Sequence, residues 1–150
     1  MKQAGYEAYE ISNFARRGHA CRHNLNYWRG GDYLGLGPGA CSHRSGWRSN
    51  NYRPLEAYLE ALRQGRPAAQ SAESLAPGQR CREAIWLGLR LAEGADLERI
   101  EEQTGLAALV YLEQEIEQQV AAGRCFLEDK RLILAPGALR IADRVAASFL

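Results

Sequence analysis

Apolar residues in the second half of the chain recur at the spacing of amphipathic helices. Each run keeps its apolar residues three or four positions apart, and each is followed by a glycine that can end a helix. The pattern therefore predicts three successive helices. Their inward residues are Cys81, Ile85, Gly88, Leu89 and Ala92 before Gly94, then Leu97 and Ile100 before Gly105, then Leu109, Leu112, Ile116 and Val120 before Gly123.

Two short apolar runs follow these helices. Residues 125–127 and 132–134 flank Asp129-Lys130, which is typical of a β-hairpin. Pro136-Gly137 then predicts the start of a closing helix. Three helices, a hairpin and a closing helix describe a winged-helix-like, mainly α domain over residues 79–150. The residues expected to face inward in the closing helix are Leu139, Ala142, Val145 and Ala146.

The first half has a weaker pattern. A β-prone run spans residues 7–14, and residues 15–28 show no period and predict a loop. Pro54 opens a helix that Gly65 can end, with an apolar stripe at i, i+3, i+4 and i+7. Residues 67–78 have the Gly, Pro, Ser and Ala content of a linker, which separates residues 1–66 from residues 79–150.

Length and composition fit one ordinary domain or two small ones. The chain has 150 residues, of which 46% are hydrophobic and 25% charged, as in an average globular protein. No apolar run approaches the ~20 residues of a membrane span, and residues 1–6 lack a signal-peptide core. The sequence therefore predicts a cytoplasmic protein.

Charge and aromatic residues divide the chain in the same place. Residues 1–70 carry a formal charge of +5 and all three histidines, whereas residues 71–150 carry −4. Nine of the 13 aromatic residues fall in residues 1–58. The first half is therefore expected to present a basic, aromatic surface to a ligand, and the second half to be an ordinary helical domain.

The four cysteines lie far apart in the sequence. No pair has C-x-x-C spacing, so neither a zinc site nor a redox motif is predicted, and free thiols are expected. A [4Fe–4S] cluster needs closely grouped thiolates, which this chain does not have. The cysteines are Cys21, Cys41, Cys81 and Cys125.

The most unusual stretch is Arg22-His23-Asn24-Leu25-Asn26-Tyr27-Trp28, followed by five glycines within residues 29–39. Asn and Gly are poor helix formers, and glycine weakens strand interiors. The stability of a helix or a strand does not explain this composition. A binding site that presents an imidazole, side-chain amides and flat rings to a ligand explains it. A loop whose aromatic residues cap a core, with an incidental histidine, is the alternative.

This stretch resembles the HemW family of radical-SAM haem chaperones, often described as oxygen-independent coproporphyrinogen III oxidase-like. The resemblance lies in the Tyr9-Glu10-Ile11-Ser12-Asn13-Phe14-Ala15 segment, the His-Asn-x-x-Tyr-Trp run at 23–28 and Gly-Asp-Tyr-Leu-Gly-Leu-Gly at 31–37. It continues with falling specificity to the C-terminus. Within the family, the His-Asn-x-x-Tyr-Trp run distinguishes the haem chaperones from true coproporphyrinogen enzymes.

The resemblance implies how the parts of the chain are used. Residues 1–66 would be the last part of a radical-SAM α/β barrel, and the C-terminal domain would be the family's winged-helix-like domain. The [4Fe–4S] cluster and S-adenosyl-L-methionine would be held by an earlier part of the barrel, so the sequence is expected to be a C-terminal fragment. The parent would bind haem, deliver it to a respiratory protein and contact the membrane only through that partner. A homodimer of the parent is possible.

The resemblance also implies roles for six residues. His23 would ligate or contact haem iron, with Asn24 beside it in the run. Tyr27 and Trp28 would offer flat apolar surface to the macrocycle. Arg22 and Arg29 would pair with the two propionates, although a solvated basic loop accounts for these arginines equally well.

Other functional hypotheses remain open beside the haem chaperone. Oxidative decarboxylation of coproporphyrinogen III is the enzymatic alternative. A winged-helix nucleic-acid-binding module is a remote one, because residues 106–123 contain no basic residue to meet phosphates. Family members usually carry His at the position of Cys41, whereas this chain has its imidazole at His43. That departure puts the role of the glycine-rich loop in doubt.

Overall fold

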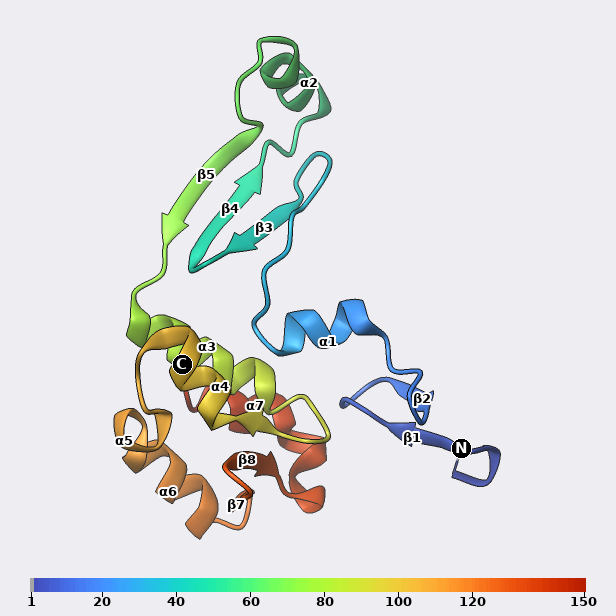
Figure 1. Cartoon of the computed structure of the whole chain (residues 1–150), viewed down its shortest axis with the longest axis vertical. Helices are drawn as coiled ribbons and strands as arrows, with labels where there is room; N and C mark the ends of the chain where they lie inside the picture. The colour runs from blue at the N-terminus through green and yellow to red at the C-terminus, as the bar shows by residue number, and fades with distance from the viewer. Residues whose placement is uncertain (1) are drawn as a thin grey trace. The chain divides into compact units, whose positions relative to one another are not determined.

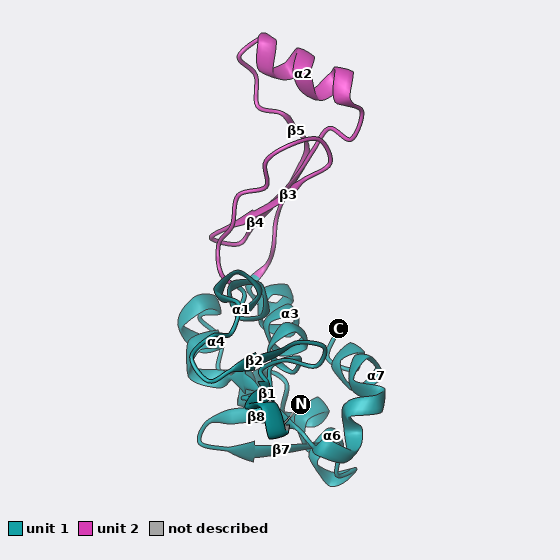
Figure 2. Ribbon diagram, turned by 90° about the vertical axis from the view of Figure 1, so that its right-hand side faces the viewer, with its two compact units in different colours: residues 1–30, 77–150 teal, residues 31–76 magenta. Residues whose placement is uncertain are grey.

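A computed structural model describes residues 2–150 of the chain as a mixed α/β structure (Figure 1). Its elements form two compact units (Figure 2). One joins the chain up to Gly30 with Pro77–Leu150, and the other is Gly31–Ala76. The first unit therefore combines two stretches that are separated in the sequence by the second. The boundaries predicted from composition, at 1–66, 67–78 and 79–150, remain predictions.

The C-terminal stretch of the first unit holds the hydrophobic core. Helices pack around a three-stranded antiparallel sheet of order β6-β8-β7. Ile85, Leu112 and Leu132 are completely buried in this core, which draws on nearly every element of the stretch. The elements are α3 (Pro77–Gly88), β6 (Ala95–Asp96), α4 (Leu97–Thr104), α5 (Ala108–Tyr111), α6 (Glu113–Ala121), β7 (Cys125–Glu128), β8 (Arg131–Leu134), the 3-10 helix η2 (Pro136–Ile141) and α7 (Ala142–Ala147).

The first two predicted helices are present. The Cys81 and Ile85 stripe of α3 is buried, but α3 ends at Gly88 rather than at Gly94, and Leu91 is buried in place of Ala92. The tight turn after Gly88 changes the phase of the following residues, which is why the helical period fails there.

The second predicted helix, α4, is capped as expected. The Asp96 carboxylate accepts a hydrogen bond from the Arg99 backbone nitrogen at 3.1 Å. At the other end Gly105 adopts a left-handed conformation and closes the helix.

The third and closing helices differ from the prediction. The third is interrupted at Leu112, whose φ of −120° separates α5 from α6, so Leu109 and Val120 are exposed while Leu112 and Ile116 stay buried. The closing helix starts as the 3-10 helix η2, which turns Leu139 outward and buries Ala138. A 3-10 turn has three residues rather than 3.6, and this rotates the stripe.

The N-terminal stretch adds a small hairpin and a helix to this unit. After the 3-10 helix η1 (Lys2–Ala4), β1 (Tyr6–Ala8) pairs with β2 (Phe14–Arg16). The predicted continuous strand over 7–14 is therefore two strands and a turn. The buried Glu10 carboxylate fixes this turn by accepting hydrogen bonds from the Ser12 nitrogen at 2.8 Å and the Asn13 amide at 2.7 Å.

Backbone hydrogen bonds tie this hairpin to the end of α3. The Ile11 nitrogen donates to the Arg90 carbonyl at 3.0 Å, and the Ala92 nitrogen donates to the Tyr9 carbonyl at 3.1 Å. The Tyr9-Glu10-Ile11 segment is therefore an extra extended segment on the C-terminal part of the fold.

The second unit is a three-stranded antiparallel sheet with one helix. β3 (Cys41–Arg44), β4 (Trp47–Asn51) and β5 (Ala69–Ser74) pair in that order, and α2 (Leu55–Arg63) connects β4 to β5. β5 lies within residues 67–78, where linker composition predicted no strand. Its residues are mostly exposed, so the strand depends on backbone pairing with β4 rather than on an apolar pattern. None of the helices over residues 2–150 has the length and apolar content needed to cross a bilayer.

Candidate functional site

The His-Asn-x-x-Tyr-Trp run forms the helix α1 (Arg22–Trp28), and not the loop that its low helix propensity predicted. The run places two pairs of residues at i and i+4, which lie on neighbouring strips of a helix. His23 and Tyr27 make one pair, and their rings meet edge to face with centroids 4.7 Å apart. His23 is exposed, so its imidazole is open to a ligand.

The second pair, Asn24 and Trp28, fastens the helix to the rest of the unit. The Asn24 amide donates a hydrogen bond to the Tyr9 hydroxyl at 3.3 Å. The guanidinium carbon of Arg90 lies over the Trp28 ring, 4.6 Å from the ring centroid. Arg90 also pairs with Asp143 of α7 at 3.0 Å. The Asn24 and Trp28 strip of α1 is therefore anchored, while His23 on the neighbouring strip is exposed.

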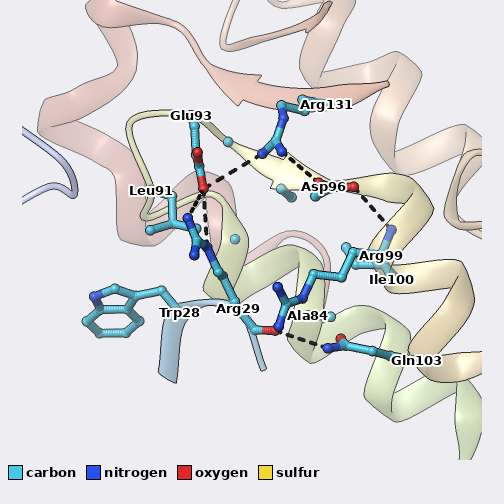
Figure 3. Close-up of a pocket in the computed structure, with 13 residues that line it drawn as sticks. Trp28, Arg29, Ala84, Leu91, Glu93, Asp96, Arg99, Ile100, Gln103 and Arg131 are labelled. Atoms are coloured by element: carbon cyan, nitrogen blue, oxygen red, sulfur yellow. Dashed lines mark hydrogen bonds and ion pairs between the residues drawn. The ribbon is translucent and has the colours of Figure 1, made fainter. Parts of the chain in front are cut away.

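Arg29, at the C-terminal end of α1, lies in a charged pocket. Its guanidinium group donates to a Glu93 carboxylate oxygen at 2.8 Å, and its carbonyl accepts from the Gln103 amide at 3.3 Å (Figure 3). Arg131 lies 3.8 Å from the same Glu93 oxygen and 2.6 Å from Asp96. Arg29 is thus already paired with a carboxylate of its own chain.

The structure therefore separates the six residues that the resemblance grouped. His23 and Tyr27 lie together, with His23 exposed and Tyr27 half-buried, and Arg22 is exposed at the start of the helix. Asn24, Trp28 and Arg29 face other parts of the first unit. At 100° per residue, Arg29 lies roughly 120–160° around the helix from the His23 and Tyr27 strip.

Sequence reasoning missed the anchors Arg90, Glu93 and Arg131. Arg29 and Glu93 are 64 positions apart in the sequence, and no local pattern indicates such a pair. Tyr9 lies in a segment that the family resemblance had already singled out, but its contact with Asn24 carried no sequence signal.

The glycine-rich loop and the residues beside it belong to the second unit. Gly35 lies so close to β3 that a Cβ there would be 2.1 Å from the Cys41 carbonyl oxygen, so no larger residue fits. The exposed Cys41 thiol donates to the Asn50 side-chain oxygen at 2.7 Å. His43 is largely covered: it pairs through its backbone with Tyr33, and its ring lies 3.8 Å from Asp32.

The four cysteines do not fit an iron–sulfur cluster. Cys21 and Cys41 are exposed and lie in different units, whereas Cys81 and Cys125 are buried in the core. No three His, Cys, Asp or Glu side chains within residues 2–150 converge as metal ligands would. The part of the chain that the structure describes therefore provides no site for a [4Fe–4S] cluster.

The same burial predicts which thiols react. At pH 8, we expect Ellman's reagent to modify Cys21 and Cys41 rapidly and Cys81 and Cys125 at least tenfold more slowly. Thiolates are the reactive form, and burial raises the pKa of Cys125 to about 11 and also raises that of Cys81. Peptide mass spectrometry after timed quenching measures each site. Urea-unfolded protein is the control, in which all four should react alike; equal rates in the native protein would contradict the burial.

Comparisons with known proteins cover both units. Residues 75–140 match the HemN C-terminal domain family. The haem chaperone HemW of a Synechocystis species is 45% identical over 98 residues, which are 63% of this chain and 23% of that protein. The haem chaperone HemW of Mycobacterium tuberculosis is 32% identical over 150 residues, which are 100% of this chain and 36% of that protein.

A solved structure shares the fold. Coproporphyrinogen III oxidase (HemN) from Escherichia coli, described as a radical SAM enzyme, superposes with a TM-score of 0.73 at 17% identity, over 99% of this chain and 38% of that one. The chain spans about a quarter to two fifths of the length of these relatives. On the evidence of the sequence matches, the chain belongs to the HemW family.

Proposed function

We propose that this chain is the haem-binding C-terminal part of a HemW-like radical-SAM haem chaperone, which delivers haem to a respiratory protein. The observation that carries the proposal is the exposed His23, paired with the half-buried Tyr27 on a helix that Asn24 and Trp28 anchor. The relatives named haem chaperones support haem as the cargo.

Different residues of α1 would have different roles in haem binding. An imidazole nitrogen is a good ligand for haem iron, and His23 presents its imidazole to solvent. The Tyr27 ring, edge-on to His23, would orient the imidazole and contact the macrocycle. Because Asn24 and Trp28 fix the neighbouring strip, the imidazole would be held on a rigid element rather than a loop.

The two arginines are not equivalent partners for propionates. Arg22 is exposed and available to an anionic group. Arg29 is paired with Glu93 and lies on another side of the helix, so a carboxylate ligand would reach it only by displacing Glu93.

The rest of the proposal concerns the whole protein. Its barrel would hold the [4Fe–4S] cluster and S-adenosyl-L-methionine, and residues 1–66 would be the end of that barrel. Residues 79–150 would be a winged-helix-like domain after a linker at 67–78. We further propose a cytoplasmic location, with a homodimer of the parent possible.

Oxygen-independent coproporphyrinogen III oxidase activity, in porphyrin biosynthesis, is the second candidate. The fold shared with HemN favours it. Conversion of coproporphyrinogen III by the full-length protein, with S-adenosyl-L-methionine and a reductant, distinguishes the two functions. DNA binding is disfavoured, since α6 carries three glutamates and Lys130 of the hairpin pairs with Glu98.

Haem titration of the 150-residue chain tests the proposal. We expect His23→Ala to weaken haem binding at least tenfold, which is about 1.4 kcal/mol, because it removes the iron ligand. His19→Ala and His43→Ala are matched controls and should bind like the unmodified chain, since His19 lies outside α1 and His43 is largely covered. Soret absorbance measures the binding.

Two results would overturn the ligand assignment. In the first, His23→Ala binds like the unmodified chain while His43→Ala loses the Soret shift, which would move the ligand to the second unit. In the second, all three variants bind alike, which would mean that no histidine of this chain ligates the iron. Absence of any Soret shift in the unmodified chain would count against haem binding by this part of the protein.

A further inference from the structure

The pocket beside Arg29 contains more positive than negative charge. It has a volume of about 110 Å³ and lies between the end of α1, α3, the turn before β6, β6 itself, α4 and the start of β8. Three guanidinium groups, those of Arg29, Arg99 and Arg131, line it together with two carboxylates, those of Glu93 and Asp96. All of these residues belong to the first unit.

Arg99 is the guanidinium group without a carboxylate. Arg29 pairs with Glu93, and Arg131 pairs with Asp96. The Nε of Arg99 is buried and has no hydrogen-bond partner among residues 2–150. Figure 3 shows its side chain extending from α4 toward Arg29, with no interaction drawn at its guanidinium group. A buried donor without an acceptor is costly, and an arginine fork suits a carboxylate best.

The two carboxylates of the pocket do not supply the missing acceptor. The Asp96 carboxylate is committed to the α4 backbone at the Arg99 nitrogen and to Arg131. Glu93 contacts Arg29 and Arg131 through the same oxygen, Oε1, and its side chain is 44% exposed. The pocket therefore already accepts one carboxylate, at its open side, and retains an unpaired donor deeper inside.

The surroundings strengthen such a site. Ala84, Leu91 and Ile100 line the pocket with apolar surface, which reduces the screening of charges inside it. Gly88 lets the turn approach closely, since a Cβ there would lie 2.6 Å from the Ala95 Cβ. The turn that carries Glu93 is thereby held against α3.

We propose that Arg99, with Arg29 and Arg131, forms a binding site for a carboxylate group of a small ligand, and that Glu93 competes with the ligand for Arg29 and Arg131. The carboxylate can come from a free small acid or from a porphyrin propionate. The second source rests on the haem-binding function proposed above, whereas the first does not.

Malonate titration of the whole chain, followed by the arginine Nε–H signals in ¹⁵N-labelled protein, tests the site. The Arg99 signal should shift and saturate, and sodium chloride at equal ionic strength should not reproduce the shift. Glu93→Ala should bind malonate at least threefold more tightly because it removes the competitor. Arg99→Met, which keeps an apolar stem, should weaken binding at least tenfold.

Arg140→Met is the matched control, because Arg140 is exposed and lies outside the pocket. It should bind malonate normally, and the backbone ¹H–¹⁵N spectrum checks that each variant is folded. Should Arg99→Met unfold the chain, Arg99→Lys gives the same test, since it keeps a charge but lacks the Nε donor. Non-saturating shifts, or equal affinities in Glu93→Ala and the unmodified chain, would overturn the proposal.

Haem and its dimethyl ester separate the two sources. If malonate competes with haem and the ester binds at least tenfold more weakly, the carboxylate is a propionate. If malonate saturates the Arg99 signal while haem binding is unaffected, the source is a free acid. A chain that binds malonate but shows no Soret shift would refute haem binding by this chain and leave the carboxylate site standing.

Discussion

Phe149→Ala is expected to destabilise the chain by about 3–5 kcal/mol, the range for emptying a buried aromatic site. Phe149 is completely buried although it is the second-last residue, and it packs in the main core with Ile85 of α3. Its carbonyl also accepts a hydrogen bond from Arg82 at 3.0 Å. Since small domains are stable by only about 5–15 kcal/mol, the loss should be large. Urea unfolding followed by circular dichroism at 222 nm measures it.

Phe126→Ala is the matched control, because it deletes the same side chain from a site that is 38% exposed. It should cost about 1 kcal/mol, since much of that ring never leaves water. If the two substitutions shift the urea midpoint equally, the C-terminal turn is not part of the core.

Phe149 also illustrates what periodicity can and cannot predict. The Cys81 and Ile85 stripe was predictable because a helix repeats its inward face every 3.6 residues. The Asp96 cap was predictable because its acceptor and the Arg99 nitrogen are three residues apart. Phe149 continues the spacing of the buried Ala142, Val145 and Ala146, but it lies past the end of α7, and chain ends usually fray. Periodicity therefore fits Phe149, whereas its complete burial beyond the helix end depends on tertiary packing.

The helix α1 is an element that helix propensity failed to predict. Its asparagines, histidine and aromatic residues have modest helix propensity, and a loop was therefore predicted. The contacts of Asn24 with Tyr9 and of Trp28 with Arg90 supply what propensity lacks. The i, i+4 spacing of two adjacent pairs was a signal in the sequence that could have indicated a helix.

Only part of the candidate site could be predicted from the sequence. The motif identified His23, which the structure leaves exposed beside Tyr27. It could not show that Arg29 faces Glu93, because pairs so distant in sequence leave no local pattern. The break at Leu112 was equally hidden, since neither glycine nor proline marks it.

Gly94→Ala carries the second large expected effect, about 2–5 kcal/mol of lost stability. Gly94 has φ +78°, a conformation that costs an L-residue about 1–2 kcal/mol. A Cβ there would also lie 2.5 Å from the Leu132 carbonyl oxygen and 2.7 Å from the Ile133 side chain. Because the first of these atoms is backbone in β8, relief requires the sheet to move, and overpacking of this kind costs about 1–3 kcal/mol. Urea unfolding measures the loss.

Gly105→Ala separates the two contributions. Its φ of +74° is nearly the same, but nothing lies within 4 Å of a Cβ at that position. Only the conformational cost should appear there, about 1–2 kcal/mol. The difference between the two variants then measures the close approach of the turn at 91–96 to β8, which also positions Glu93 at the pocket. Equal losses would mean that this turn shifts freely, and that Gly94 is required for its backbone conformation alone.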